Sequence, residues 1–179
     1  SLGTEQIEER QKKAQRILRD DGATFKIYDE PEANQQWQMN PVPLLIASDE
    51  WQRIESGLVE RAELMNLILQ DFYSEKHLLR RKVIPPELLF SHPGFLRPCH
   101  GIKLTAKHQL TLHAADLVRD DKGQFCVMGD RTQAPSGAGY ALENRTVMNR
   151  VFPSLFRDCQ VHRLSLFFAR LRQGLQQLN

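Results

Sequence analysis

The chain has 179 residues, of which 41% are hydrophobic, and a formal net charge of +2. This composition suits one globular domain with a buried core, and the near-neutral charge gives no sign of a nucleic-acid or anionic-membrane partner. No apolar run reaches the roughly 18 residues of a membrane-spanning helix, and the charged start argues against a signal peptide. The three widely spaced cysteines favour a reducing, cytoplasmic location over a disulfide framework.

The first part of the chain predicts a helix, a strand and two irregular segments. Apolar residues at helical spacing predict an amphipathic helix over 4–20. Alternation predicts a short strand over 24–28. The polar segment 30–40 carries a proline and predicts a loop, and the prolines of 41–46 favour extended backbone.

The longest predicted helix spans 48–73, and Ser48 suits its N-terminal cap. Apolar residues recur every three or four positions and predict a stripe that faces the core: Trp51, Ile54, Leu58, Ala62, Met65, Leu69 and Phe72. The polar residues of this helix, Arg61 included, are interpreted as a solvated face. Asn66 stands apart because its neighbours are apolar.

Two short helices are predicted over 74–83 and 85–90, and the prolines and glycines of 92–101 predict an irregular loop. We expect Arg97 to bind substrate, because a loop stiffened by proline can present the guanidinium fork to a carboxylate or phosphate. The same loop holds three potential metal ligands without the second close pair that a tetrahedral zinc site needs: His92, Cys99 and His100.

Segments 110–118 and 124–128 predict a β-hairpin around a turn that ends at Gly123. Asp116 lies on the first strand and Asp130 follows the second, so a regular hairpin brings the two carboxylates near each other. Carboxylates at a sheet end are suited to holding magnesium against phosphates. The alternative is that Asp116 is a solvent-facing strand residue.

Residues 129–150 form a polar corner between this strand and a helix that starts at about Tyr140. Glycines beside a serine in the loop 134–139 let the backbone approach an anion, and the free N–H groups of the helix start favour one. The alternative is a hairpin exit followed by a capped helix. We expect five side chains to converge on one anion-binding cleft: Asp130, Arg131, Ser136, Asn144 and Arg145.

A helix over 143–151 and an amphipathic helix over 161–178 complete the predicted elements. Together the elements predict an α+β fold, a small antiparallel β-sheet with flanking helices.

Five segments occur in an order that resembles the circularly permuted type 2 ATP-grasp family: E-R-A-E-L-M-N-L-I-L-Q-D-F-Y (60–73), I-P-P-E-L (84–88), H-P-G-F-L-R-P-C-H-G (92–101), A-D-L-V-R-D-D-K-G (115–123) and D-R-T-Q-A-P-S-G-A-G-Y-A-L-E-N-R (130–145). The resemblance covers most of 24–175, and the last segment is highly specific. It implies two parts, an N-terminal helix over 1–23 and a partial ATP-grasp domain over 24–179. Because the family's chains are longer, we expect this one to be an N-terminal portion that works with the remainder of a full-length protein.

The resemblance implies ATP-dependent joining of a carboxylate to an amine, as small molecules or peptides, through an acyl phosphate. It implies ATP and Mg²⁺ as cofactors. The hairpin and its loop are also similar to glutathione synthetase and, distantly, to glutathionylspermidine synthase-like ligases. Other type 2 members have Glu-Asp-Asn where this chain has Gly129, Asp130 and Arg131. Arginine is a fixed cation and cannot ligate a metal.

Two interpretations remain open. In a ligase portion, the metal ligands are Asp116 and Asp130, and the catalytic residues are Arg131 and Arg145. Substrate or phosphate binding then involves four further residues: Arg97, Ser136, Gly137 and Asn144. The alternative is a non-catalytic, ATP-grasp-like binding or scaffold module that has lost its metal ligands. A nucleic-acid binder is disfavoured because the basic residues are scattered and lack an aromatic platform.

Overall fold

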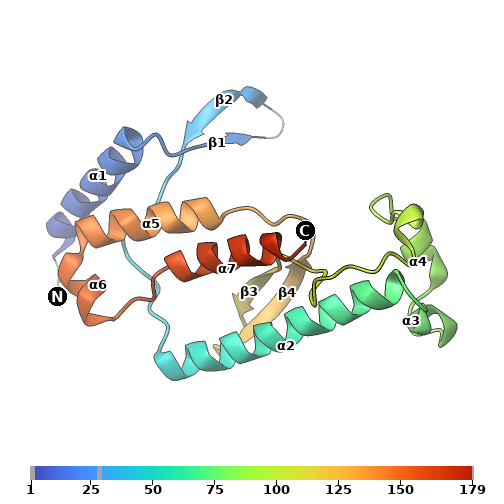
Figure 1. Cartoon of the computed structure of the whole chain (residues 1–179). Coiled ribbons are helices and arrows are strands. Elements are labelled where there is room, and N and C mark those ends of the chain that lie inside the picture. The colour runs from blue at the N-terminus through green and yellow to red at the C-terminus, as the bar shows by residue number, and fades with distance from the viewer. Residues whose placement is uncertain (1–2, 28–29, 179) are drawn as a thin grey trace. The chain divides into compact units, whose positions relative to one another are not determined.

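The computed structural model describes residues 3–27 and 30–178 (Figure 1). Its contacts divide the chain into a first unit, Ser1–Leu45 with Ser136–Leu164, and a second unit, Ile46–Pro135 with Ser165–Asn179. Each unit combines helices with one two-stranded antiparallel sheet, which confirms the predicted α+β class. None of the helices in the described ranges is long and apolar enough to cross a membrane.

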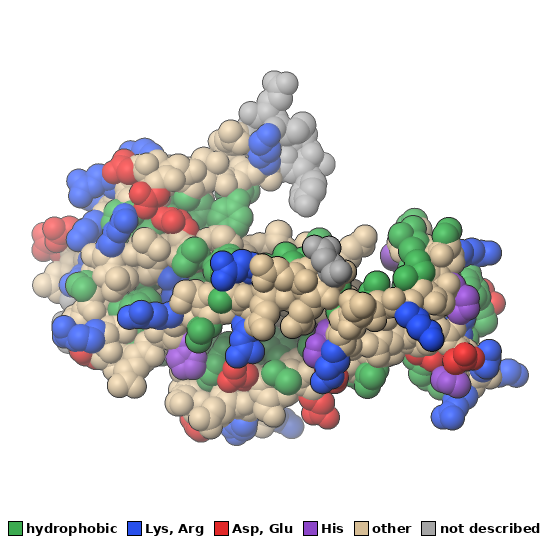
Figure 2. Space-filling view, in the orientation of Figure 1, with side chains coloured by type: hydrophobic (Ala, Val, Ile, Leu, Met, Phe, Trp, Pro, Cys, Tyr) green, Lys and Arg blue, Asp and Glu red, His purple; other side chains and the backbone are tan. Residues whose placement is uncertain are grey.

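The first unit is built on two helices that share a core. Its elements are α1 (Thr4–Asp20), β1 (Thr24–Ile27), β2 (Glu30–Gln36), α5 (Ala138–Val151) and α6 (Pro153–Asp158). Buried side chains from α1, α5 and their flanking segments form one cluster: Ala14, Leu18, Met39, Val147, Val151 and Phe152. Figure 1 shows α1 alongside α5, and Figure 2 shows acidic and basic side chains interspersed over the exposed face of α1. The predicted division after residue 23 stays a prediction, while α1 packs as part of this unit.

The predicted loop over 30–40 is wrong, because β2 occupies most of it. β2 pairs antiparallel with β1, with Thr24 opposite Gln36 and Phe25 opposite Gln35. The Trp37 N–H extends this pairing by donating to the Ala23 carbonyl at 2.9 Å. Backbone pairing with a neighbouring strand therefore overrides the weak strand propensity of a Gln- and Asn-rich segment.

The second unit contains the long helix and the hairpin. Its elements are α2 (Ser48–Phe72), α3 (His77–Arg80), α4 (Pro86–Phe90), the 3₁₀ helix η1 (Arg97–Cys99), β3 (Ala114–Arg119), β4 (Phe125–Arg131) and α7 (Ser165–Gln176). α3 is shorter than the predicted helix over 74–83, and α7 begins later than the predicted residue 161. At α3, the Asp71 carboxylate accepts the N–H groups of His77 at 2.7 Å and Leu78 at 3.0 Å, which fixes the start of this short helix.

The hairpin prediction is confirmed. β3 and β4 pair antiparallel, and Gly123 adopts the left-handed conformation, φ 77°, that the turn requires. Asp120 Oδ1 accepts the N–H groups of Lys122 and Gln124 and holds the turn closed. Ala115 lies opposite Asp130 and Asp116 opposite Gly129, and the register shifts between Asp116 and Leu117.

The predicted inward stripe of α2 is only partly correct. Trp51 is 40% exposed, so its placement in the core was wrong, and Leu58, Met65 and Phe72 are partly buried. The deeply buried α2 side chain is Asn66, 3% exposed. Its Oδ1 accepts the N–H groups of Gln109 at 2.9 Å and Leu110 at 3.1 Å, so an amide rather than an apolar side chain anchors α2 to the segment before β3.

Candidate functional site

The Asp130 carboxylate, at the end of β4, is held by two basic side chains. Arg61 of α2 donates from Nε to Oδ1 at 2.7 Å and from Nη2 to Oδ2 at 2.6 Å. His113 Nε2 lies 2.9 Å from Oδ1. The hydrogen bond from Arg61, helped by the one with His113, lowers the pKa of Asp130 to about 2 against the opposing effect of burial. Asp130 is therefore an ionised, firmly oriented carboxylate.

The other predicted metal ligand, Asp116, lies on the opposite face of the hairpin. Successive residues of a strand point to opposite faces of the sheet. Asp130 and Ala115, which pair across the hairpin, therefore lie on one face, and Asp116 and Gly129, the next pair, lie on the other. Arg131, two residues beyond Gly129, reaches the same side, and its Nε donates to Asp116 Oδ2 at 3.0 Å. Both partners of this ion pair are more than half exposed, so it contributes little to stability.

The residues of this corner, as they lie, do not fit a magnesium ion. Both oxygens of Asp130 accept hydrogen bonds from Arg61, and Asp116 lies on the other face, bound to Arg131. Gly129 and Arg131 offer no ligand atom in their side chains. Within residues 3–27 and 30–178, no group of three or more His, Cys, Asp and Glu could hold a metal ion. Magnesium binding by Asp116 and Asp130 stays a prediction that this donor set does not favour.

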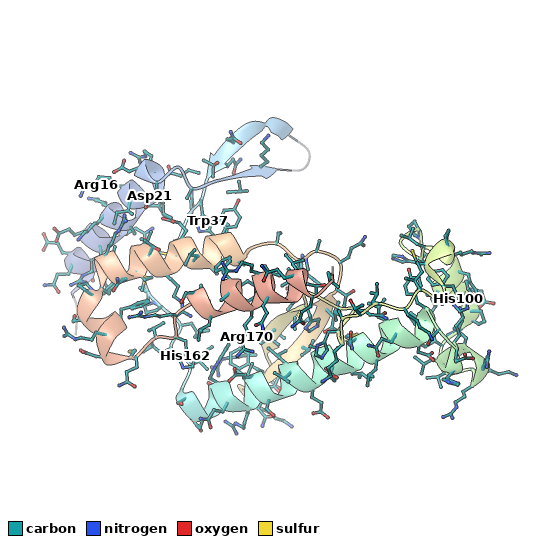
Figure 3. The ribbon with its side chains drawn as sticks, viewed as in Figure 1. Arg16, Asp21, Trp37, His100, His162 and Arg170 are labelled. Atoms are coloured by element: carbon teal, nitrogen blue, oxygen red, sulfur yellow. The ribbon has the colours of Figure 1, made fainter. Side chains whose placement is uncertain are left out.

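Asn144 and Arg145 are adjacent on α5 in the first unit. The Trp37 indole Nε1 donates to Asn144 Oδ1 at 2.9 Å, and its ring stacks on Tyr140 with centroids 4.3 Å apart. Arg145 Nη1 donates to the carbonyl of His162 at 2.7 Å (Figure 3 labels Trp37 and His162). Partial burial lowers the pKa of Arg145, because it removes some of the water that solvates the charged guanidinium.

Ser136 and Gly137 lead into α5. Gly137 is the residue before the helix and has φ 108°, a conformation that a side chain would strain. Ser136 is exposed. α5 starts at Ala138, slightly earlier than the predicted residue 140, so the predicted loop ends where the helix N–H groups begin to be free.

Arg97 contacts an aromatic ring rather than an acid. Its guanidinium carbon lies 5.3 Å from the centroid of Phe90, a cation–π contact within the second unit. In the same region His92 Nδ1 accepts the N–H of Gly94 at 3.0 Å, and His100 Nδ1 lies 2.7 Å from Lys76 Nζ. A substrate-binding role for Arg97 stays a prediction.

The structure brings two pairs of predicted site residues together, and it does not test whether all five corner side chains converge on one cleft. Asp116 and Arg131 form an ion pair in the second unit, and Asn144 and Arg145 lie side by side in the first. The predicted convergence of all five corner side chains involves residues of both units. That convergence stays a prediction.

Sequence reasoning missed three residues that position the site: Arg61, His113 and Trp37. Arg61 was interpreted as part of a solvated face, but it lies next to the stripe residue Ala62 and reaches Asp130. His113 alternates with Ala115, which is a signal that it shares a face with Asp130. Trp37 is an aromatic residue in a polar segment, the kind of residue that needs a partner for its ring N–H.

Comparison with known proteins identifies relatives over most of the chain. The family model described as circularly permuted ATP-grasp type 2 matches residues 43–179. The uncharacterized protein Rv2567 of Mycobacterium tuberculosis is 42% identical over 139 residues, 78% of this chain and 16% of that protein. The uncharacterized protein sll0335 of Synechocystis is 32% identical over 178 residues, 99% of this chain and 37% of that protein.

A third relative, the uncharacterized protein ML0605 of Mycobacterium leprae, is 33% identical over 161 residues, 90% of this chain and 28% of that protein. The chain thus spans from 16% to 37% of the length of these relatives. The family match includes four of the resemblance segments entirely within the second unit and the fifth, 130–145, which enters α5. This chain belongs to the circularly permuted type 2 ATP-grasp family.

Proposed function

We propose that this chain is part of an ATP-dependent ligase that joins a carboxylate to an amine through an acyl phosphate. Family membership supports an ATP-dependent, ligase-like module. The observation that carries the finer proposal is the pair Asn144 and Arg145 in the most specific family segment. In each side chain, one polar group forms a hydrogen bond with a partner in the first unit, and further N–H donors remain. Donors of this kind suit a substrate carboxylate.

In such a reaction a carboxylate oxygen forms a bond to the γ-phosphorus of ATP, and ADP leaves. The amine nitrogen then attacks the acyl carbon, inorganic phosphate leaves with the bonding electron pair, and the nitrogen loses a proton. In the first unit, Asn144 and Arg145 would hold the carboxylate. In the second unit, Arg131 would offer a positive charge to a phosphoryl group. Ser136 and Gly137 would offer hydroxyl and backbone contacts to phosphate oxygens.

A second candidate is an ATP-grasp-like binding or scaffold module without catalysis. Two features at the end of β4 favour it. The Asp130 and Asp116 carboxylates are each paired with an arginine, and the side chains at positions 129 and 131 carry no metal-ligand atom. A protein that uses the fold for binding alone has no need of a metal site there.

Isothermal titration of ATP into the full-length protein, with and without magnesium, separates the two candidates. The ligase proposal expects saturable binding that Arg131→Ala weakens about tenfold or more, since hydrogen bonds to charged groups are worth roughly 1.5–3 kcal/mol. Arg53→Ala, which removes a largely exposed arginine of α2, is the matched control and should leave binding unchanged. Absence of binding with every nucleotide tested would contradict the ligase and leave the binding module.

A further inference from the structure

A cavity of about 380 Å³ lies along α5 in the first unit. Most of its wall is apolar, contributed by α5, α6 and the segment after β2: Leu44, Leu45, Met148, Phe152, Leu155 and Phe156. Leu44 and Leu45 are 71% and 64% exposed, so this wall is not closed by other described residues. The volume falls within the range of small-molecule pockets.

Asn144 lines this cavity and has its amide orientation fixed from behind. The indole N–H of Trp37 is a donor only, so the group it contacts at 2.9 Å must be the carbonyl oxygen of Asn144. The stacking of Trp37 on Tyr140, whose hydroxyl donates to the Thr24 carbonyl at 2.8 Å, holds the indole in place. The NH₂ group of Asn144 therefore remains as a donor, and it has no partner among the described residues.

Arg145 lines the same cavity with spare donors. Of the five guanidinium N–H groups, one binds the His162 carbonyl, and the others have no hydrogen-bond partner in the described part of the chain. No Asp or Glu belongs to the cavity wall as described. The free N–H groups of Arg145 and Asn144 therefore lie beside apolar side chains and can donate hydrogen bonds to an anion in the cavity.

We propose that this cavity binds a small molecule in which an oxyanion group, a carboxylate or a phosphate, is attached to an apolar body. The oxyanion accepts hydrogen bonds from the Asn144 NH₂ group and the Arg145 guanidinium. The apolar body lies against Met148, Phe152 and Phe156. The ligand thus combines one negatively charged group with an aliphatic or aromatic group. The charged group complements the N–H donors of the cavity wall, and the apolar group matches its apolar side chains.

This inference rests on the proposed function only for its place in a reaction, where the bound acid would be the carboxylate substrate of the ligase. The binding itself needs no nucleotide. A protein that binds the acid but not ATP would retain this site and lose the ligase proposal. A protein that binds ATP but not the acid would lose this site alone.

The test is isothermal titration of 3-phenylpropionate into the full-length protein without nucleotide. We expect saturable binding, at least tenfold tighter than binding of 3-phenylpropionamide, which has the same body without the charge. Acetate, an oxyanion without the phenyl body, should also bind at least tenfold more weakly, because its single methyl group buries little apolar surface. Phenyl phosphate distinguishes the source of the oxyanion: tighter binding than 3-phenylpropionate assigns the site to a phosphate ester, and weaker binding to a carboxylate.

The variants Asn144→Asp and Arg145→Gln test the two donors separately. Asn144→Asp keeps an oxygen for Trp37 but replaces the NH₂ group by a negatively charged oxygen, so binding of 3-phenylpropionate should fall at least tenfold. Arg145→Gln should lower it to a similar extent. Asn149→Asp and Arg157→Gln make the same changes at exposed positions and should leave binding unchanged.

Thermal unfolding of each variant shows whether it remains folded. If Arg145→Gln does not fold, Asn144→Asp still tests the proposal, because it keeps the hydrogen bond from Arg145 to the His162 carbonyl. Equal affinity for the acid and its amide would overturn the proposal. So would undiminished binding by a folded Asn144→Asp variant, or no saturable binding of either oxyanion probe at millimolar concentration.

Discussion

At the scale of single residues, Asp130 owes its low pKa to basic neighbours rather than to exposure. Arg61 and His113 bind the ionised carboxylate, and its pKa falls from 3.8 to about 2. A carboxyl whose folded-state pKa is lowered adds stability above its unfolded pKa and loses it as the pH falls through the folded value. The contribution of Asp130 to stability should therefore be present at neutral pH and be lost progressively as the pH falls from about 4 through about 2.

The variant Asp130→Asn tests this contribution. It should lower the free energy of unfolding at pH 7 and lower it much less at pH 2, where about half of the native carboxyl is already protonated. Urea unfolding at both pH values measures the difference. Asp116→Asn is the matched control, because Asp116 is 54% exposed and its ion pair with Arg131 is solvated. An equal loss at both pH values would show that Asp130 acts through packing and not through charge.

Glu143 has the opposite character. Burial, and then a hydrogen bond and like charge from Asp21, raise its pKa, while Arg150 lowers it. Its Oε1 is buried without a hydrogen-bond partner in the described structure. A carboxyl whose pKa is raised in the folded state lowers the free energy of unfolding as the pH rises above its unfolded pKa. The reason is that the unfolded chain then ionises more readily than the folded one.

Glu143→Gln should therefore increase the free energy of unfolding at pH 7, and this gain should shrink toward pH 4. Melting temperatures across this pH range provide the measurement. Glu8→Gln, at an exposed position of α1, is the control and should show no such pH dependence. A destabilised Glu143→Gln variant at pH 7 would mean that the ionised carboxylate is needed where it lies.

At the scale of elements, α2 is anchored by a polar residue. Asn66 satisfies two backbone N–H groups of the segment before β3, and both lose their acceptor if the side chain is shortened. Asn66→Ala should cost about 1–3 kcal/mol for each N–H left without a partner. Gln52→Ala on the exposed face of the same helix should stay within about 0.5 kcal/mol. Denaturant unfolding compares the two, and equal costs would show that Asn66 is not the anchor.

The elements also show which structural information was present in the sequence. The 3.6-residue spacing of α2, the turn at Gly123 and the paired strands around it are local signals, and they predicted these elements correctly. β2 was missed because its strand form depends on β1 rather than on its own polar residues. Trp51 was misplaced because spacing predicts a stripe but not how much of it another element covers.

The sequence predicted some residues of the site but not their partners. Asp130, Asn144 and Arg145 all belong to the family segment 130–145, so the sequence alone identifies them as candidates. Their partners lie far along the chain: Arg61 is 69 residues from Asp130, and Trp37 is 107 residues from Asn144. Hydrogen bonds over such separations depend on tertiary packing, which no local pattern encodes.

At the scale of the whole molecule, buried apolar residues are unevenly divided between the two units. Six of the seven buried apolar side chains among the described residues belong to the first unit, including Leu18 and Val147, and only Leu89 belongs to the second. The first unit therefore has a compact core of its own, in which the 0% exposed side chain of Val147 contacts residues of α1 and α5.

Val147→Ala should destabilise this core selectively. Removing two buried methyl-sized groups costs about 2 kcal/mol, part of it for the cavity left behind. Hydrogen exchange of the backbone amides should report faster opening in α1 and α5, whose shared core loses packing. Amides of α2, whose buried residue Asn66 belongs to the second unit, should retain their protection. Asn66→Ala should give the reverse pattern. If Val147→Ala exposed α1, α5 and α2 equally, the two units would unfold as one cooperative structure, and the core of the first unit would then support the whole chain.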